Sequence, residues 1–110
     1  MAEKINLVRN DTRPAVTVTL SDAPTGAVID VTGATVRLKF REAGATELTA
    51  TLVATLVSPT EGVVLFDWAD APTALAGEPG NYEGEIEITF ADGTIHTVYD
   101  TLRFRMRADF

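Results

Sequence analysis

The chain contains no cysteine and a single histidine, His96. The absence of cysteine excludes a disulfide framework and any thiolate site, so stability must come from packing and from backbone hydrogen bonds. A lone histidine has no second histidine or cysteine with which to hold a metal ion. We therefore expect His96 to be an ordinary strand residue, and we expect no metal and no cofactor.

Long apolar runs and a surplus of positive charge are missing as well. No apolar stretch approaches the ~20 residues that a membrane span requires, and the N-terminus has no signal-peptide pattern. Nine Lys and Arg residues stand against sixteen Asp and Glu residues, which gives a net charge of −7 and a pI near 4.5. Nucleic acids and anionic lipids demand a basic footprint. The composition therefore predicts a protein made in the cytoplasm that binds neither.

The length of 110 residues is sufficient for one domain to bury a core of its own. We predict a single domain over residues 1–110. Residues 1–8 and 108–110 lie outside the clearest strand patterns, and we expect them to be peripheral arms.

The last third of the chain has the clearest secondary-structure pattern. Residues 82–90 alternate between apolar and mostly acidic side chains, and residues 102–107 alternate between apolar and basic ones. Alternation with a period of two is typical of a half-buried β-strand. Since the tight turn at 91–94 contains Asp-Gly, the pattern predicts that these two strands form one antiparallel hairpin.

A third strand, residues 36–41, also has a basic outward face. Three strands therefore hold most of the patterned charge: Arg37, Lys39 and Arg41 on the first; Glu83, Glu85 and Glu87 on the second; Arg103, Arg105 and Arg107 on the third. Opposite charges on neighbouring strands contribute roughly 0.2–1 kcal/mol per pair, and like charges destabilise. We predict that the acidic strand lies between the two basic strands in one sheet.

The rest of the chain consists of short alternating segments separated by turn residues. One segment, 70–76, begins with Asp and Pro and is followed by Gly77, which indicates a short helical turn. Strands at this spacing favour an all-β, immunoglobulin-like β-sandwich of about seven antiparallel strands. We expect the core faces to hold most of the aromatic side chains: Phe40, Phe66, Trp68, Tyr82, Phe90 and Phe104.

No arrangement of residues points to catalysis. Asp67 and Asp70 flank Trp68, but a core tryptophan between a solvated aspartate and a helix-capping one explains this pattern. Ser21 and Ser58 lie in turns without the strand–nucleophile–helix elbow of a hydrolase. No glycine-rich phosphate loop occurs. We predict that the chain is not an enzyme and takes no small-molecule substrate.

Several segments together carry a family resemblance. They are NDTRP (10–14), DVTGATV (30–36), GVVLFDW (62–68), TALAG (73–77), GNYEGEI (80–86) and FADGT (90–94). In order and spacing, from about Arg9 to Arg107, they resemble the N-terminal immunoglobulin-like domain of the tailed-bacteriophage baseplate upper protein family. In that family the domain is a structural module without catalytic residues.

The resemblance implies a non-enzymatic structural protein of a phage virion. It would be a tail or baseplate adaptor that docks other virion proteins, in multiple copies around a symmetry axis. A capsid decoration protein or a neck (head–tail) protein is an alternative within the virion. A carbohydrate-binding module is an alternative of another class, although it normally presents several aromatic residues on one platform.

Partner contacts are expected at apolar side chains near the chain ends and in loops. Ile5, Leu7, Tyr99 and Phe110 are the candidate docking residues, because a lone monomer would leave such side chains exposed. The sheet edges are further candidates, since a partner can add a strand there.

Overall fold

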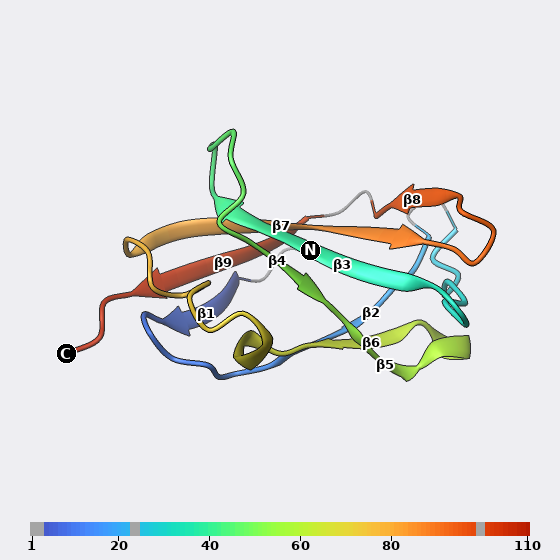
Figure 1. Ribbon diagram of the computed structural model, residues 1–110, viewed down its shortest axis with the longest axis horizontal. Coiled ribbons are helices and arrows are strands. Elements are labelled where there is room, and N and C mark those ends of the chain that lie inside the picture. The colour runs from blue at the N-terminus through green and yellow to red at the C-terminus, as the bar shows by residue number, and fades with distance from the viewer. Residues whose placement is uncertain (1–3, 23–24, 99–100) are drawn as a thin grey trace.

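The computed structural model describes residues 4–22, 25–98 and 101–110 (Figure 1). Their regular structure is nearly all β. The strands are β1 (Lys4–Val8), β2 (Val16–Thr19), β3 (Thr35–Glu42), β4 (Ala50–Val53), β5 (Thr55–Ser58), β6 (Val63–Phe66), β7 (Gly80–Thr89), β8 (Ile95–Thr97) and β9 (Leu102–Arg107). Two single turns of 3₁₀ helix, η1 (Pro59–Glu61) and η2 (Trp68–Asp70), precede and follow β6.

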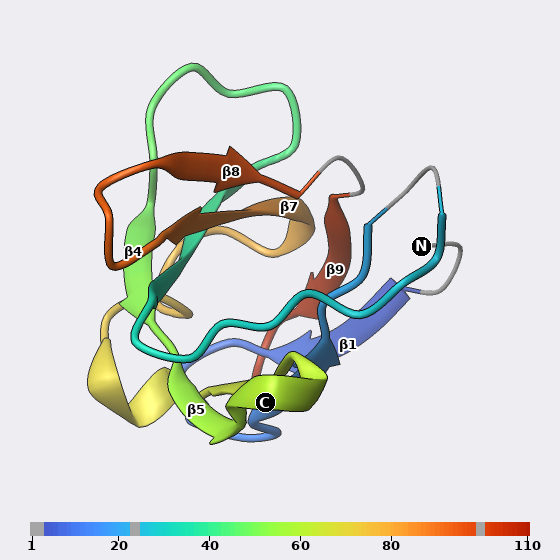
Figure 2. The same ribbon diagram turned by 90° about the vertical axis from the view of Figure 1, so that its right-hand side faces the viewer.

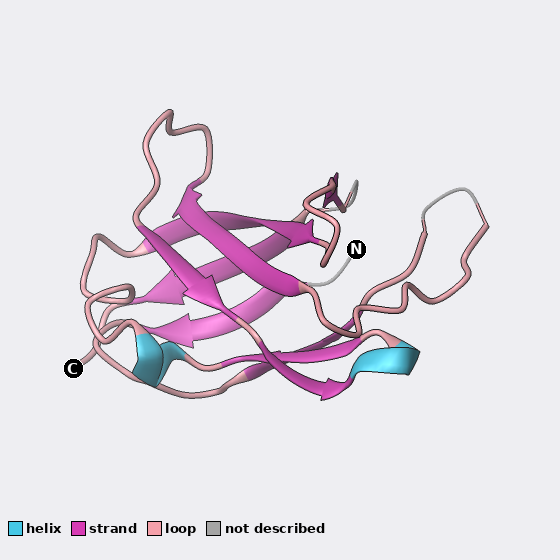
Figure 3. Ribbon diagram, turned by 45° about the vertical axis from the view of Figure 1, so that its right-hand side comes forward, coloured by secondary structure: helices cyan, strands magenta, loops and turns pink. Residues whose placement is uncertain are grey.

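The strands form two sheets that pack face to face (Figure 3). The larger sheet has the order β1-β9-β7-β3-β4, and β8 pairs with the end of β7. The smaller sheet has the order β2-β6-β5. All pairs are antiparallel except β1 with β9, which is parallel.

The chain passes from one sheet to the other along both sides of the sandwich. β1 continues through a connection with a cis Arg13-Pro14 bond into β2 of the other sheet. β4 continues through Ala54 alone into β5. Figure 2 shows β4 running into β5 on one side and β1 on the other. Each side of the sandwich is therefore bordered by one continuous segment.

The core follows from the alternation of the strands. Four aromatic rings from different elements meet at its centre: Phe40 stacks on Tyr82 at 4.9 Å and meets Trp68 and Phe104 edge-on at 5.0 and 5.2 Å between ring centroids. Such pairs contribute about 0.5–1.5 kcal/mol beyond their area burial. All of the aromatic residues expected in the core are buried except Phe90, which is half-buried and packs against it.

The β-sandwich prediction is confirmed, and so is the order of the charged strands. β7, the acidic strand, lies between β3 and β9. The details differ from the expected seven antiparallel strands, because the described residues form nine strands and one pair is parallel. The predicted hairpin is also more complex: the turn after β7 leads into β8, whereas β9 pairs with the first half of β7.

The helical turn begins earlier than the expected 70–76. The side chain of Asp67 accepts a hydrogen bond from the Ala69 N–H at 2.9 Å and caps η2, so the turn starts at Trp68 rather than at Asp70. Residues after Asp70 form irregular turns, such as the Ala74 N–H donating to the Ala71 carbonyl.

The expected N-terminal arm is also corrected. Lys4–Val8 is a strand of the larger sheet, because Ile5 and Leu7 alternate with outward residues and the backbone pairs with β9. Leu7 is only 2% exposed and belongs to the core. Ala108–Phe110 lies beyond the last strand and is exposed, as expected for an arm.

Candidate binding surface

The outward face of the larger sheet carries the patterned charge. Because side chains alternate along a strand, burial of Leu102, Phe104 and Met106 on β9 places the arginines between them on the outer face. The same alternation exposes the glutamates of β7 and the basic residues of β3 on that face. This face is where the sequence concentrates charged side chains.

Two ion pairs join β7 and β3 on the outward face. The register places Arg37 beside Glu87, Lys39 beside Glu85 and Arg41 beside Glu83. Lys39 Nζ lies 2.8 Å from Glu87 Oε2, and Arg41 Nη2 lies 3.5 Å from Glu83 Oε1. Glu83 also accepts the Gly44 N–H at 3.1 Å. Glu83 and Glu87 therefore bind toward β3 rather than toward β9.

The β9–β1 half is different, and we call the outward side chains of Lys4, Arg103, Arg105 and Arg107 the basic face. Register places Arg103 opposite Glu83, but it places Arg105 opposite the neutral Asn81. β7 begins at Gly80, opposite Met106, so no residue of β7 lies opposite Arg107. The parallel pairing of β1 adds Lys4 beside Arg103. Among the described residues, none of the four forms an ion pair.

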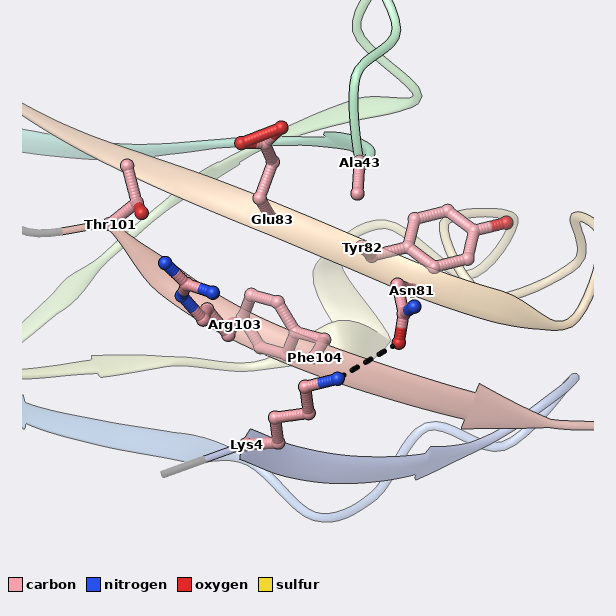
Figure 4. A pocket seen from close by; sticks show the side chains of 8 residues that line it. All are labelled: Lys4, Ala43, Asn81, Tyr82, Glu83, Thr101, Arg103 and Phe104. Carbon is pink, nitrogen blue, oxygen red and sulfur yellow. Dashed lines mark hydrogen bonds between the residues drawn. The ribbon is translucent and has the colours of Figure 1, made fainter. Parts of the chain in front are cut away.

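A shallow hollow lies at one end of the basic face (Figure 4). Its volume is about 240 Å³, and its polar groups come from two cations, Lys4 and Arg103, one carboxylate, Glu83, and the neutral Asn81, Tyr82 and Thr101. Lys4 Nζ donates to Asn81 Oδ1 at 3.2 Å, which holds the ammonium over β9. Tyr82 also lines the hollow, and its hydroxyl donates to the Glu78 carbonyl at 2.6 Å. Burial, with Glu42 and Glu78 nearby, raises the pKa of Tyr82.

The other end of the basic face reaches the C-terminus. The Arg107 guanidinium lies 5.0 Å from the centre of the Phe110 ring and donates to the Ala108 carbonyl at 2.9 Å. Phe110 is fully exposed, as a docking residue must be. Asp109 is the acidic group at this end, and its carboxylate accepts from the Asn10 amide at 3.2 Å.

The structure separates the predicted docking residues. Phe110 lies at the surface, Ile5 is half-buried against the core, and Leu7 is inside the core. The docking prediction for Leu7 is wrong, because its side chain already packs within its own molecule. Tyr99 lies outside the described residues.

The residues that the sequence offered as candidates for chemistry have structural roles or stand alone. Asp67 caps η2, and Trp68 is fully buried. His96 is an exposed residue of β8. Among the described residues, no three His, Cys, Asp or Glu side chains lie close enough together to hold a metal ion, and no helix is long and apolar enough to cross a membrane.

Two Asp-x-Thr turns have the only lowered carboxyl pKa values resolved in the described residues. Asp30 accepts the hydroxyl and the backbone N–H of Thr32 at 2.6 and 2.9 Å, and Asp92 accepts the same two groups of Thr94 at the same distances. These hydrogen bonds, from the hydroxyl first, hold both pKa values below the ordinary range. Their role is to fix the turns before β3 and before β8.

No family model and no curated protein matches the chain. A solved structure, CopC from Methylosinus trichosporium OB3b, superposes with a TM-score of 0.54 at 12% sequence identity, covering 97% of this chain and 86% of the other. The likeness shows the fold alone.

The predicted role in a phage virion is contradicted. A solved structure that shares this fold over nearly the whole chain is a CopC protein, not a baseplate, tail, neck or capsid protein. The motifs behind the resemblance occupy turn and core positions, such as the left-handed Gly62 and Gly93 and the buried Phe66 and Trp68. Unrelated sandwiches can share such positions, so these motifs predicted the fold and not the function.

The sequence pattern predicted the outward arginines of β9, but it did not predict that they lack ion pairs. The prediction was that Glu83, Glu85 and Glu87 would pair with cations on both neighbouring strands. The missing signal was the register, since β9 pairs with the part of β7 that begins at Gly80 and contains only one glutamate, Glu83, facing an arginine. The contribution of Lys4 depends on a parallel pair between the two ends of the chain, which no local pattern predicts.

Proposed function

We propose that this chain is a non-catalytic binding module whose basic face receives an acidic segment of another protein. The observation that carries the proposal is the set of four cations on β1 and β9, in a chain of net charge −7, that have no ion pair among the described residues. Such a local reversal of sign attracts an acidic partner and orients it as it approaches.

The spacing of the cations suits an extended segment. Arg103, Arg105 and Arg107 alternate along one strand, so their side chains recur about every 6.6–6.8 Å. Alternate carboxylates of an extended peptide have the same repeat. The sheet already contains this arrangement, because β7 presents its glutamates to the cations of β3 at matching register. Lys4, paired beside Arg103, adds a fourth cation to this row.

Nucleic acid is less well supported as a partner. A long polyphosphate chain needs a continuous basic surface, whereas the basic face is bordered by Glu83 and Glu85 on β7 and by Asp109 at the C-terminus. A short acidic segment of a protein fits within these borders.

Binding of a labelled peptide of about ten residues that alternates Glu and Thr tests the proposal, with a Lys-Thr peptide as the negative probe. Two exposed ion pairs are worth about 0.2–1 kcal/mol each, so the double variant R105Q/R107Q should bind the acidic peptide roughly 2- to 30-fold more weakly. The control K39Q/R41Q makes the same change in net charge at the two cations of β3 that form ion pairs with β7, and it should change binding much less.

Three results would overturn the proposal. The first is no binding of the acidic peptide at low salt. The second is an equal loss of affinity in the two double variants, which would mean that net charge alone acts. Tighter binding of a DNA oligonucleotide or of anionic lipid vesicles, lost in R105Q/R107Q, would assign the basic face to a different class of partner.

A further inference from the structure

The side of the sandwich formed by β4 and β5 is an unprotected edge. Residues 48–60 are the longest run of the chain without a charged side chain, and they contain β4, Ala54 and β5. Long uncharged edges rich in Val and Thr pair readily with further strands, and natural proteins normally interrupt them with charge, proline or a bulge. This edge has no charged side chain on either strand, and its proline, Pro59, comes only after β5 ends. The pairing of β5 shifts register between Leu56 and Ser58, whereas β4 pairs with β3 in regular register over Ala50–Val53, so β4 is the unprotected part of the edge.

The backbone of β4 has groups directed away from the molecule. The Ala54 N–H donates to the Val36 carbonyl at 2.8 Å, so Ala54 belongs to the set of residues that bond to β3. Because such residues alternate along an antiparallel strand, Leu52 and Ala50 also bond to β3. Thr51 and Val53 therefore direct their N–H and C=O groups toward the open edge, where no described strand pairs with them.

Apolar side chains accompany these backbone groups. Val53 is 53% exposed and Val57 is 57% exposed. On the opposite side of the sandwich, β1 and β2 hold none of the exposed large apolar side chains of the described residues, and β1 carries Lys4. η2 packs beside β4 but leaves Thr51 and Val53 exposed.

We infer that the β4 edge pairs with the same edge of a second copy of this chain. A two-fold axis at Leu52 would place Thr51 opposite Val53 of the other copy in an antiparallel, self-complementary pair. Both residues would then exchange backbone hydrogen bonds, and β-branched side chains would meet across the outer face. The two larger sheets would become one continuous sheet.

No like charges would meet where the second copy of the chain pairs with this edge. The paired segments carry no charge, so no like charges lie opposite each other. The nearest row of cations is on β3, and Arg37 of one copy would lie about 14 Å from Lys39 of the other, three strand spacings away. That distance exceeds the Debye length of ~8 Å at physiological salt. The net charge of −7 on each copy opposes association at low salt only.

The dependence on salt separates this inference from the proposed function. Screening weakens the long-range repulsion between two acidic copies, so self-association should strengthen as salt rises. Binding of an acidic peptide to the basic face should weaken over the same range. Failure of one therefore leaves the other standing.

Sedimentation velocity over about 0.02–1 mM protein, the range for a weak interface of small area, tests the pairing. The wild type should shift from monomer toward dimer, more strongly at high salt, and V53K should reduce association about tenfold or more because it places a charge on the edge. V28K is the matched control, since Val28 is 54% exposed but lies off the edge, and it should associate like the wild type.

Amide hydrogen exchange locates the contact. At high protein concentration the Thr51 and Val53 amides should exchange more slowly in the wild type and not in V53K. A monomer at the highest concentration and salt would overturn the inference. So would equal effects of V53K and V28K, or a dimer in which exchange at Thr51 and Val53 is unchanged.

Discussion

Replacement of Gly62 by alanine should be one of the most damaging small substitutions in this protein. Gly62 follows η1 with φ = 71°, its N–H donates to the Pro59 carbonyl, and its own carbonyl accepts the Leu20 N–H at 2.8 Å. A Cβ there would lie 2.7 Å from the Ile29 carbonyl oxygen and 2.8 Å from that of Leu20. Both distances are far below ordinary contact.

The clash cannot relax cheaply, because both obstructing atoms belong to the backbone. The Leu20 carbonyl also accepts the Ile29 N–H at 2.9 Å, so moving it away would break the contact between β2 and the following loop. A left-handed alanine costs roughly 1–2 kcal/mol, and overpacking adds about 1–3 kcal/mol. We expect Gly62→Ala to lower the free energy of unfolding by about 2–5 kcal/mol.

Gly44→Ala is the matched control. Gly44 has φ = 82°, but nothing lies within 4 Å of the position of its Cβ. It should therefore cost only the conformational part, about 1–2 kcal/mol. Urea unfolding followed by fluorescence of the single tryptophan, the fully buried Trp68, measures both variants. A Gly62→Ala variant that loses no more stability than Gly44→Ala would refute the steric reasoning.

Three further outcomes are expected. Leu7→Ala should lower the free energy of unfolding by about 2–5 kcal/mol, since Leu7 is a core residue; a loss below about 0.5 kcal/mol, typical of surface positions, would return residues 1–8 to the status of an arm. Folding raises the pKa of Tyr82. The contribution of neutral Tyr82 to stability is therefore fully present below the ordinary tyrosine pKa of about 10, and it is lost as pH rises through the pKa of Tyr82 in the folded state. Absorbance titration near 295 nm should show an ionisation above the ordinary tyrosine pKa that Y82F removes, and a Y82F variant that still shows this late ionisation would contradict it. Because folding lowers the pKa of Asp30 and Asp92, their contribution is present above about pH 4 and is lost as pH falls through the folded values; D30N/D92N should flatten the melting temperature's acid dependence there, and an unchanged profile would count against these turns.

Much of the fold follows from local patterns in the chain. Alternation over 36–41, 82–90 and 102–107 determined which side chains are buried, because a strand places successive residues on opposite faces. The charges on the outward positions determined the order β9-β7-β3, since that order avoids placing the two basic strands side by side. Both conclusions require only the order of residues along each strand and the sign of the charge at each outward position.

Contacts between distant parts of the chain decided the rest. The parallel pairing of Lys4–Val8 with β9 turned an expected arm into a strand and brought Lys4 to Arg103. The register of β9 on β7 left Arg105 and Arg107 without glutamates opposite them, and the position of β4 at the end of its sheet left Thr51 and Val53 at an open edge. The sequence by itself determined the faces of the strands, because alternation is local. Only the tertiary structure decided which charges and which backbone groups remain for a partner, because register and edge position depend on pairing between segments far apart in the chain.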